Sequence, residues 1–253
     1  MTPIVSPAEV PSEAVLLDAR PAAAYAVGHA PNARHADLDR QLAAVDDPKH
    51  GGRHPLPPLD RWLALLGEWG ITPSTPVVIY DDAKGANAAA RAWWMLRAVR
   101  HEDVAVLDGD WRSLSAGADP HPASSYPATA WQLPTVGMAE VESLRQDDQW
   151  RVLDVRAAER YRGETEPIDP VAGHIPGAIN LFFGENLEEG RFKSPEALRE
   201  QYRALLGDVP PERVVVHCGS GVTACHTLLA LEHAGLRGAS LYVGSWSEWC
   251  RNH

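Results

Sequence analysis

Short runs of apolar residues alternate along the chain with longer stretches of helical periodicity. Two of these runs, Val77–Tyr80 and Val214–His217, are rich in β-branched residues and have the length of strands buried on both faces. Each is followed by a stretch that we expect to be helical, residues 88–99 after the first run and 223–234 after the second, with Gly235 suited to the second helix end. This alternation predicts an α/β fold in which a mostly parallel sheet is flanked by helices on both faces.

The pattern occurs twice, and repeated polar motifs accompany it. Four blocks of the first half return in the same order in the second half, which is not expected by chance. The pairs are 16–20 with 152–156, 28–33 with 173–178, 77–80 with 214–217, and 107–111 with 242–246. The chain is therefore predicted to contain two tandem copies of one domain.

A segment rich in Pro, Ser and Ala, residues 119–127, separates the two copies and is typical of a linker. We assign residues 1–124 to an N-terminal domain and residues 125–253 to a C-terminal domain, each large enough to hold its own core. In parallel sheets of this kind, ligands bind beyond the carboxyl ends of the strands. The functional residues are therefore expected in the loops that follow the two apolar runs.

Composition restricts the partners and the compartment. A hydrophobic content of 45% is typical of a globular protein with a core, and the formal net charge of -11 argues against nucleic acid or an anionic membrane as the main partner. The N-terminus lacks the features of a signal peptide, and no run is long and apolar enough to span a membrane. Three cysteines fit a reducing compartment better than a disulfide framework. These features together predict a cytoplasmic protein.

The loop after the second apolar run contains the strongest chemical signal in the sequence. Cys218 follows the strand directly, and Gly219 and Gly221 let the backbone curl before a helix begins. The N–H groups of such a loop and the helix dipole both favour a thiolate and would hold an anionic sulfur attached to it. Most free cysteines are small buried side chains, which is our interpretation of Cys225 and Cys250, with an exposed redox thiol as the alternative for Cys250. The surrounding loop predicts that Cys218 is instead a nucleophile.

The first copy has no thiol at the matching position. Where the second copy has Cys218, the first has Asp81 followed by Asp82, and two carboxylates would repel an anionic substrate. We therefore expect residues 1–124 to have kept the fold without the catalytic activity.

These motifs resemble the tandem-domain rhodanese family, and more closely its 3-mercaptopyruvate sulfurtransferase branch. The resemblance spans nearly the whole chain and is carried by residues 218–224, 173–178 and 244–249. It implies an enzyme that forms a persulfide on Cys218, takes the sulfur from a small anionic donor and passes it to a thiol, to cyanide or to a thioredoxin-like protein. It implies no metal or organic cofactor, and the spacing of His and Cys offers no zinc site.

Within the family, the residues after the cysteine vary with the donor. Members that use thiosulfate carry basic residues there, whereas Gly219 and Ser220 are neutral, as in members that use 3-mercaptopyruvate. Together with Gly221, Val222 and Thr223, they form the loop that the resemblance assigns to substrate binding.

The resemblance also predicts how the donor carboxylate is bound, through two arginines of the second copy. Arg160 matches one of them. The second is expected shortly before residue 173, but residues 164–172 contain no arginine. Arg162 either compensates for this loss or is a solvated surface charge. Because of this departure, thiosulfate remains the alternative donor.

A proton relay completes the residues carried over from the family. Ser220 matches a loop serine, while Asp39 and His54 match an aspartate and a histidine contributed by the first half of the chain. Histidine supplies protons near neutral pH, as protonation of a pyruvate enolate requires. The alternative interpretation is an exposed aspartate and a loop histidine without a catalytic role.

Two other functions use a similar loop. A cysteine phosphatase needs an arginine six positions after its cysteine to clamp the phosphoryl oxygens, and here that position is Ala224. A catalytically idle binding or sulfur-relay module is the second alternative, and the intact loop at Cys218 argues against it for the chain as a whole.

Overall fold

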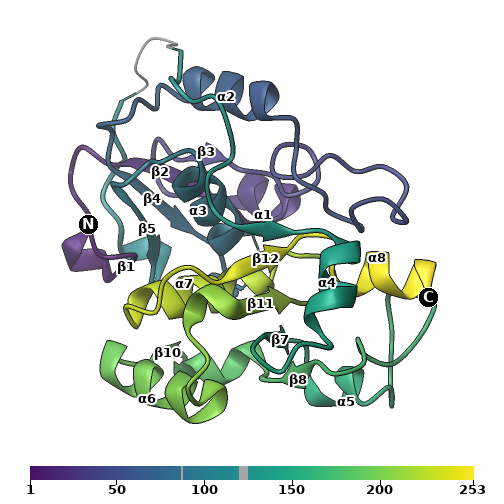
Figure 1. The fold of residues 1–253 in the computed structure, drawn as a ribbon. Coiled ribbons are helices and arrows are strands. Elements are labelled where there is room, and N and C mark those ends of the chain that lie inside the picture. The colour runs from purple at the N-terminus through teal and green to yellow at the C-terminus, as the bar shows by residue number, and fades with distance from the viewer. Residues whose placement is uncertain (87, 120–124) are drawn as a thin grey trace. The chain divides into compact units, whose positions relative to one another are not determined.

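The computed structural model describes residues 1–86, 88–119 and 125–253, and it divides into two compact units of the same α/β architecture (Figure 1). Unit 1 consists of residues Met1–Ala44 and Pro57–Leu133, and unit 2 consists of Val45–Leu56 and Pro134–His253. Within the described ranges, no helix has the length and apolar character needed to cross a membrane.

Unit 1 is built on a five-stranded sheet in the order β1-β5-β4-β2-β3, and every pair of neighbouring strands is parallel. All residues of the three central strands are buried, which explains why these strands are continuous apolar runs rather than alternating ones. The strands are β1 Ile4–Val5, β2 Val15–Asp18, β3 Arg34–His35, β4 Val77–Tyr80 and β5 Val104–Leu107, and the α-helices beside them are α1 Ala22–Val27, α2 Leu59–Glu68 and α3 Ala89–Ala98.

Unit 2 repeats this sheet strand for strand, in the order β6-β12-β11-β7-β8, again with parallel neighbours, and adds a small antiparallel pair, β9 with β10. The main strands are β6 Thr135–Val136, β7 Arg151–Asp154, β8 Ile179–Asn180, β11 Val214–His217 and β12 Ser240–Tyr242, and the added pair is β9 Leu187–Glu188 and β10 Arg191–Phe192. The α-helices are α4 Met138–Leu144, α5 Ala158–Tyr161, α6 Pro195–Leu206, α7 Ala224–His233 and α8 Ser245–Asn252. The predicted duplication and the parallel α/β fold are confirmed.

The repeated polar motifs have a structural role that is the same in both units. In unit 2, the Arg156 guanidinium binds both carboxylate oxygens of Asp154 and donates to the carbonyl of Gly173, 2.7 Å away. The imidazole of His174 stacks on Tyr161 with 4.0 Å between ring centroids. The matching contacts of unit 1 join Arg20 to Asp18 and to the carbonyl of Gly28, and His29 to Tyr25. The motifs therefore hold the loop after α1 or α5 against the sheet.

The register of unit 2 determines which loops come together. β11 pairs with β7 so that His217 lies beside Asp154, and β12 pairs with β11 on the other side. Because all three strands are parallel, their carboxyl ends share one edge of the sheet. The loops after residues 154, 217 and 242 therefore leave from that edge.

The segment between the copies behaves differently from a simple linker. Residues 120–124, which contain the predicted boundary, lie outside the described ranges, so the division at 124/125 stays a prediction. Beyond them, Tyr126 donates to or accepts from the His101 ring at 3.0 Å, and the Gln132 N–H donates to the Ala98 carbonyl at 2.7 Å. Residues up to Leu133 thus pack with unit 1, while Val45–Leu56 packs with unit 2.

Candidate active site

Cys218 lies directly after β11, in the loop that leads into α7, and is 3% exposed. The turn between strand and helix depends on Gly221, which has φ +73°; a Cβ atom there would come within 2.4 Å of the Val243 carbonyl oxygen. Thr223 is the residue before α7, whose first residue is Ala224. Strand end, tight turn and helix start follow one another in the order that the sequence predicts.

The backbone around Cys218 is held by the start of α8. The Ser245 hydroxyl accepts the Cys218 N–H at 3.2 Å and donates to the Tyr242 carbonyl at 2.9 Å. The Trp246 N–H donates to the Cys218 carbonyl at 3.0 Å, and the next N–H along the chain donates to Gly219 at 2.9 Å. Both peptide groups of Cys218 are therefore fixed by residues 244–249, which at the level of sequence indicated only the family. The sequence signal for this supporting role was their position directly after β12, which ends at the same edge of the sheet as β11.

Two of the predicted relay residues come together. The Nδ1 atom of His54 and the Oγ atom of Ser220 lie 2.8 Å apart, with Ser220 buried and His54 half-buried. His54 reaches the loop because residues 45–56 belong to unit 2: the Gly51 N–H donates to Glu248 at 2.8 Å. Asp39 lies in an exposed turn of unit 1, and its role stays a prediction.

The two arginines named from the sequence differ in position. Arg160, in α5, is about four-fifths buried, and its guanidinium binds the buried carboxylate of Glu166 at 2.6 Å. Its terminal nitrogens lie beside Gly219, at 3.6 and 3.7 Å from the place where a Cβ atom of that residue would be. Arg162 is more than half exposed and pairs with the exposed Glu164 at 2.6 Å. The structure therefore favours the surface-charge interpretation of Arg162.

A further arginine that sequence reasoning missed lies at the same loop. Arg53 is the residue before His54, and its Nη2 atom is the nearest one to the Cβ position at Gly219, at 3.2 Å. Its other terminal nitrogen binds Asp169, whose side chain is fully buried. Asp169 also accepts from Arg251 at 2.8 Å. The signal in the sequence was the pair of glycines before Arg53, which let this segment approach another backbone closely.

Two further groups near the loop, His217 and Cys250, are buried, and burial shifts the pKa of each toward its neutral form. Burial lowers the pKa of His217, and the carboxylate of Asp154 adds a smaller effect in the opposite direction. Burial also raises the pKa of the Cys250 thiol, and the charge of Asp169 raises it further. Cys225 is fully buried and Cys250 is 6% exposed, so neither is an exposed redox thiol. Among the described residues, no group of His, Cys, Asp and Glu side chains is arranged to hold a metal ion.

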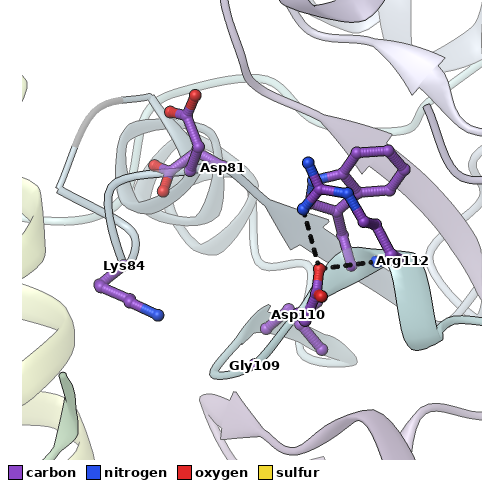
Figure 2. Close-up of a pocket in the computed structure, with 8 residues that line it drawn as sticks. Asp81, Lys84, Gly109, Asp110 and Arg112 are labelled. Atoms are coloured by element: carbon purple, nitrogen blue, oxygen red, sulfur yellow. Dashed lines mark hydrogen bonds and ion pairs between the residues drawn. The ribbon is translucent and has the colours of Figure 1, made fainter. Parts of the chain in front are cut away.

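The matching loop of unit 1 is filled by a carboxylate. Asp81, directly after β4, accepts the N–H groups of Ala83 and Gly85 at 2.8 Å with one oxygen and that of Ala89 at 3.2 Å with the other. Asp81 and Lys84 line a pocket of about 330 Å³ together with residues of the loop after β5 (Figure 2). The other residues that line it are Asp82, Leu107, Gly109, Asp110, Trp111 and Arg112. An internal carboxylate thus takes up the N–H donors that would otherwise bind an anion, which supports the predicted inactivity of this copy.

Comparisons with known proteins agree with this architecture. Residues 8–116 and 138–252 each match the rhodanese-like domain family. The chain is 43% identical over 234 residues to a probable 3-mercaptopyruvate sulfurtransferase of Pseudomonas aeruginosa, covering 89% of this chain and 82% of the relative. It is 40% identical over 240 residues to a putative thiosulfate sulfurtransferase of Mycobacterium tuberculosis, covering 90% and 82%.

Among solved structures, the 3-mercaptopyruvate sulfurtransferase from Leishmania major superposes with a TM-score of 0.83 at 29% identity, covering 98% of this chain and 74% of that one. The likeness extends over both copies and confirms the resemblance drawn from the loop and the repeated motifs. The chain belongs to the rhodanese family as a tandem-domain sulfurtransferase.

Proposed function

We propose that the chain transfers sulfur from 3-mercaptopyruvate to a thiol or to cyanide through a persulfide on Cys218. The observation that carries the proposal is the position of Cys218 at the carboxyl end of β11, in a loop whose Ser220 contacts His54 and whose Gly219 lies beside the guanidinium of Arg160. The thiolate form of Cys218 is the nucleophile of this reaction.

In the first step, the Cys218 thiolate attacks the sulfur atom of the donor. A sulfur–sulfur bond forms, the carbon–sulfur bond breaks, and its electron pair stays on carbon as the enolate of pyruvate. A proton from the site then reaches that carbon and pyruvate leaves. The contact of 2.8 Å between His54 and Ser220 offers a route for this proton from imidazole to hydroxyl.

In the second step, the acceptor removes the outer sulfur. A thiolate or cyanide attacks it, the sulfur–sulfur bond breaks, and the electron pair returns to Cys218 as thiolate. A small thiol, cyanide or a reactive thiol of a thioredoxin-like protein has the chemistry that this step needs. The order of steps leaves a persulfide enzyme as the resting intermediate between two separate substrates.

Thiosulfate is the second candidate donor, and the comparisons give it support because one relative is named for it. Neutral residues after Cys218 favour 3-mercaptopyruvate, since a dianion is better matched by basic ones.

The test is a comparison of the two donors under identical conditions: pyruvate release from 3-mercaptopyruvate, and thiocyanate formation from thiosulfate and cyanide. We expect kcat/KM to be higher with 3-mercaptopyruvate. Cys218→Ser should abolish both reactions, while Cys250→Ala, which removes another buried thiol of unit 2, should leave them in place. Turnover by Cys218→Ser, or the reverse donor preference, would contradict the proposal.

A further inference from the structure

The family resemblance calls for two arginines at the donor carboxylate, yet the segment 164–172 supplies none. It contains Asp169 instead, a residue of opposite charge. In the structure this aspartate is not near solvent: its side chain is fully buried and faces the guanidinium groups of Arg53 and Arg251. The segment that lost its arginine therefore binds an arginine that comes from elsewhere in the chain.

Gly219, the residue after Cys218, shows where these guanidinium groups lie. The three atoms nearest to its Cβ position are all guanidinium nitrogens: Nη2 of Arg53 at 3.2 Å, and Nη2 and Nη1 of Arg160 at 3.6 and 3.7 Å. Two arginines from segments more than a hundred residues apart thus meet beside the nucleophile loop, each with a side chain about four-fifths buried.

Arg53 is held at both ends. Its backbone N–H donates to the Ser247 hydroxyl at 3.0 Å, and its Nη1 atom binds Asp169. The preceding residue, Gly52, lies so close to α8 that a Cβ atom there would come within 2.3 Å of the Gly244 carbonyl oxygen. With Nη1 anchored, Nη2 is the terminal nitrogen nearest to the Cys218 loop. This is the arrangement of a preorganised side chain rather than of a solvated surface charge.

The ion-pair network beside the loop contains one more positive than negative group. Within the part of the chain that the structure describes, the connected network joins four guanidinium groups to three carboxylates. These are Arg53, Arg156, Arg160 and Arg251 with Asp154, Glu166 and Asp169. Largely buried guanidinium groups bind carboxylates more strongly than exposed ones because solvent screens them less.

We propose that Arg53 is the second donor-binding arginine of this enzyme: Arg53 and Arg160 together bind the carboxylate of the α-keto donor, and Asp169 positions Arg53. The proposal rests on the proposed function of Cys218. A planar carboxylate matches the two forked guanidinium groups. Arg53 thereby replaces the arginine that residues 164–172 lack, and Arg162 is not needed for it.

The proposal is tested on Arg53→Gln, with Arg237→Gln as the matched control. Arg237 carries the same charge, is largely exposed and pairs with Glu232, so the control makes the same change in net charge at the surface. The first readout is the KM for 3-mercaptopyruvate and for thiosulfate. The second needs no turnover: it is the ratio of the alkylation rates of Cys218 by iodoacetate, which carries a carboxylate, and by neutral iodoacetamide.

We expect Arg53→Gln to raise the KM for 3-mercaptopyruvate roughly tenfold or more, and to lower the iodoacetate-to-iodoacetamide ratio by a similar factor, as loss of a charged hydrogen bond does. Arg237→Gln should stay within about twofold of the wild type in both. Arg53→Lys, which keeps the charge but loses the fork, should be intermediate. If Arg53→Gln also lowers the rate of alkylation by iodoacetamide, its effect is not specific to the carboxylate, and Arg53→Lys is then the variant compared with the wild type.

Two results would overturn the proposal: an alkylation ratio in both Arg53 variants equal to that of Arg237→Gln, or a rise in KM for thiosulfate alone. If the wild-type chain turned over neither donor, the proposed function would fail, whereas a fall in the alkylation ratio would still establish the carboxylate site. The two failures are therefore distinguishable.

Discussion

Replacing Gly221 by alanine should separate the stability of unit 2 from the geometry of its active site. Gly221 has φ +73°, a conformation that costs alanine about 1–2 kcal/mol, and the added Cβ would lie 2.4 Å from the Val243 carbonyl oxygen. An ordinary contact begins near 3.4 Å, so the loop must move by about 1 Å away from the end of β12. We expect a total loss of about 2–4 kcal/mol in the free energy of unfolding.

The displacement should affect catalysis as well as stability. Cys218 is three residues before Gly221, and a misplacement of about 1 Å at a reacting atom costs roughly a hundredfold in rate. Gly235→Ala is the matched control, because Gly235, just after the other end of α7, has φ +76° but its Cβ would make only an ordinary contact, at 3.6 Å with Arg199. It should lose about 1 kcal/mol and keep kcat/KM within about twofold.

The assay pairs urea unfolding with kcat/KM for 3-mercaptopyruvate in both variants. We expect both variants to lose stability, Gly221→Ala by about 2–4 kcal/mol and Gly235→Ala by about 1 kcal/mol, but only Gly221→Ala to lose activity. Equal activities in the two variants would falsify the claim that the close approach to Val243 sets the position of Cys218.

Two further predictions follow from contacts and burial. His54→Asn and Ser220→Ala should each lower kcat with 3-mercaptopyruvate at least tenfold. Because the two groups share one contact of 2.8 Å, the double variant should lose much less activity than the product of the single losses. Multiplicative losses in a double-mutant cycle would mean that the two residues act separately. The pKa of His217 lies below its usual value of 6.5 because the side chain is buried. Near and below pH 6.5, the unfolded chain therefore binds a proton that the folded chain does not. This contribution to the free energy of unfolding is present above that pH and is lost as the pH falls. Between pH 7.5 and 5.5, His217→Gln should flatten the pH profile of unfolding of unit 2, whereas an unchanged slope would assign the acid sensitivity to other groups.

Local pattern was sufficient for the framework of both units. The predicted strands Val77–Tyr80 and Val214–His217 coincide with β4 and β11, and the two helices that follow differ from prediction by one residue at each end. These elements are predictable because β-branched runs and helical periodicity are properties of neighbouring residues. The loop that holds Cys218 was found in the same way, since a strand, a glycine turn and a helix start are consecutive in the chain.

Contacts between distant segments were beyond the reach of such patterns. Arg53 and Asp169 are 116 residues apart in sequence, and nothing local in 164–172 indicates that its aspartate binds an arginine. The supporting role of Ser245 likewise depends on two strands ending at one sheet edge. Conversely, the sequence left open whether Arg162 compensates for the missing arginine or is a surface charge, and the fold exposes it and pairs it with Glu164.

The central claim, that Cys218 carries the transferred sulfur, is tested most directly by mass spectrometry. The wild-type protein, incubated with 3-mercaptopyruvate and no acceptor, is blocked by alkylation, digested and mapped peptide by peptide. The account predicts that the peptide containing Cys218 and Cys225 gains the mass of one sulfur atom, that its fragments place this mass on Cys218, that Cys250 gains none, and that cyanide removes the gain. Persulfide on another cysteine, or pyruvate release with Cys218 unmodified throughout, would contradict it.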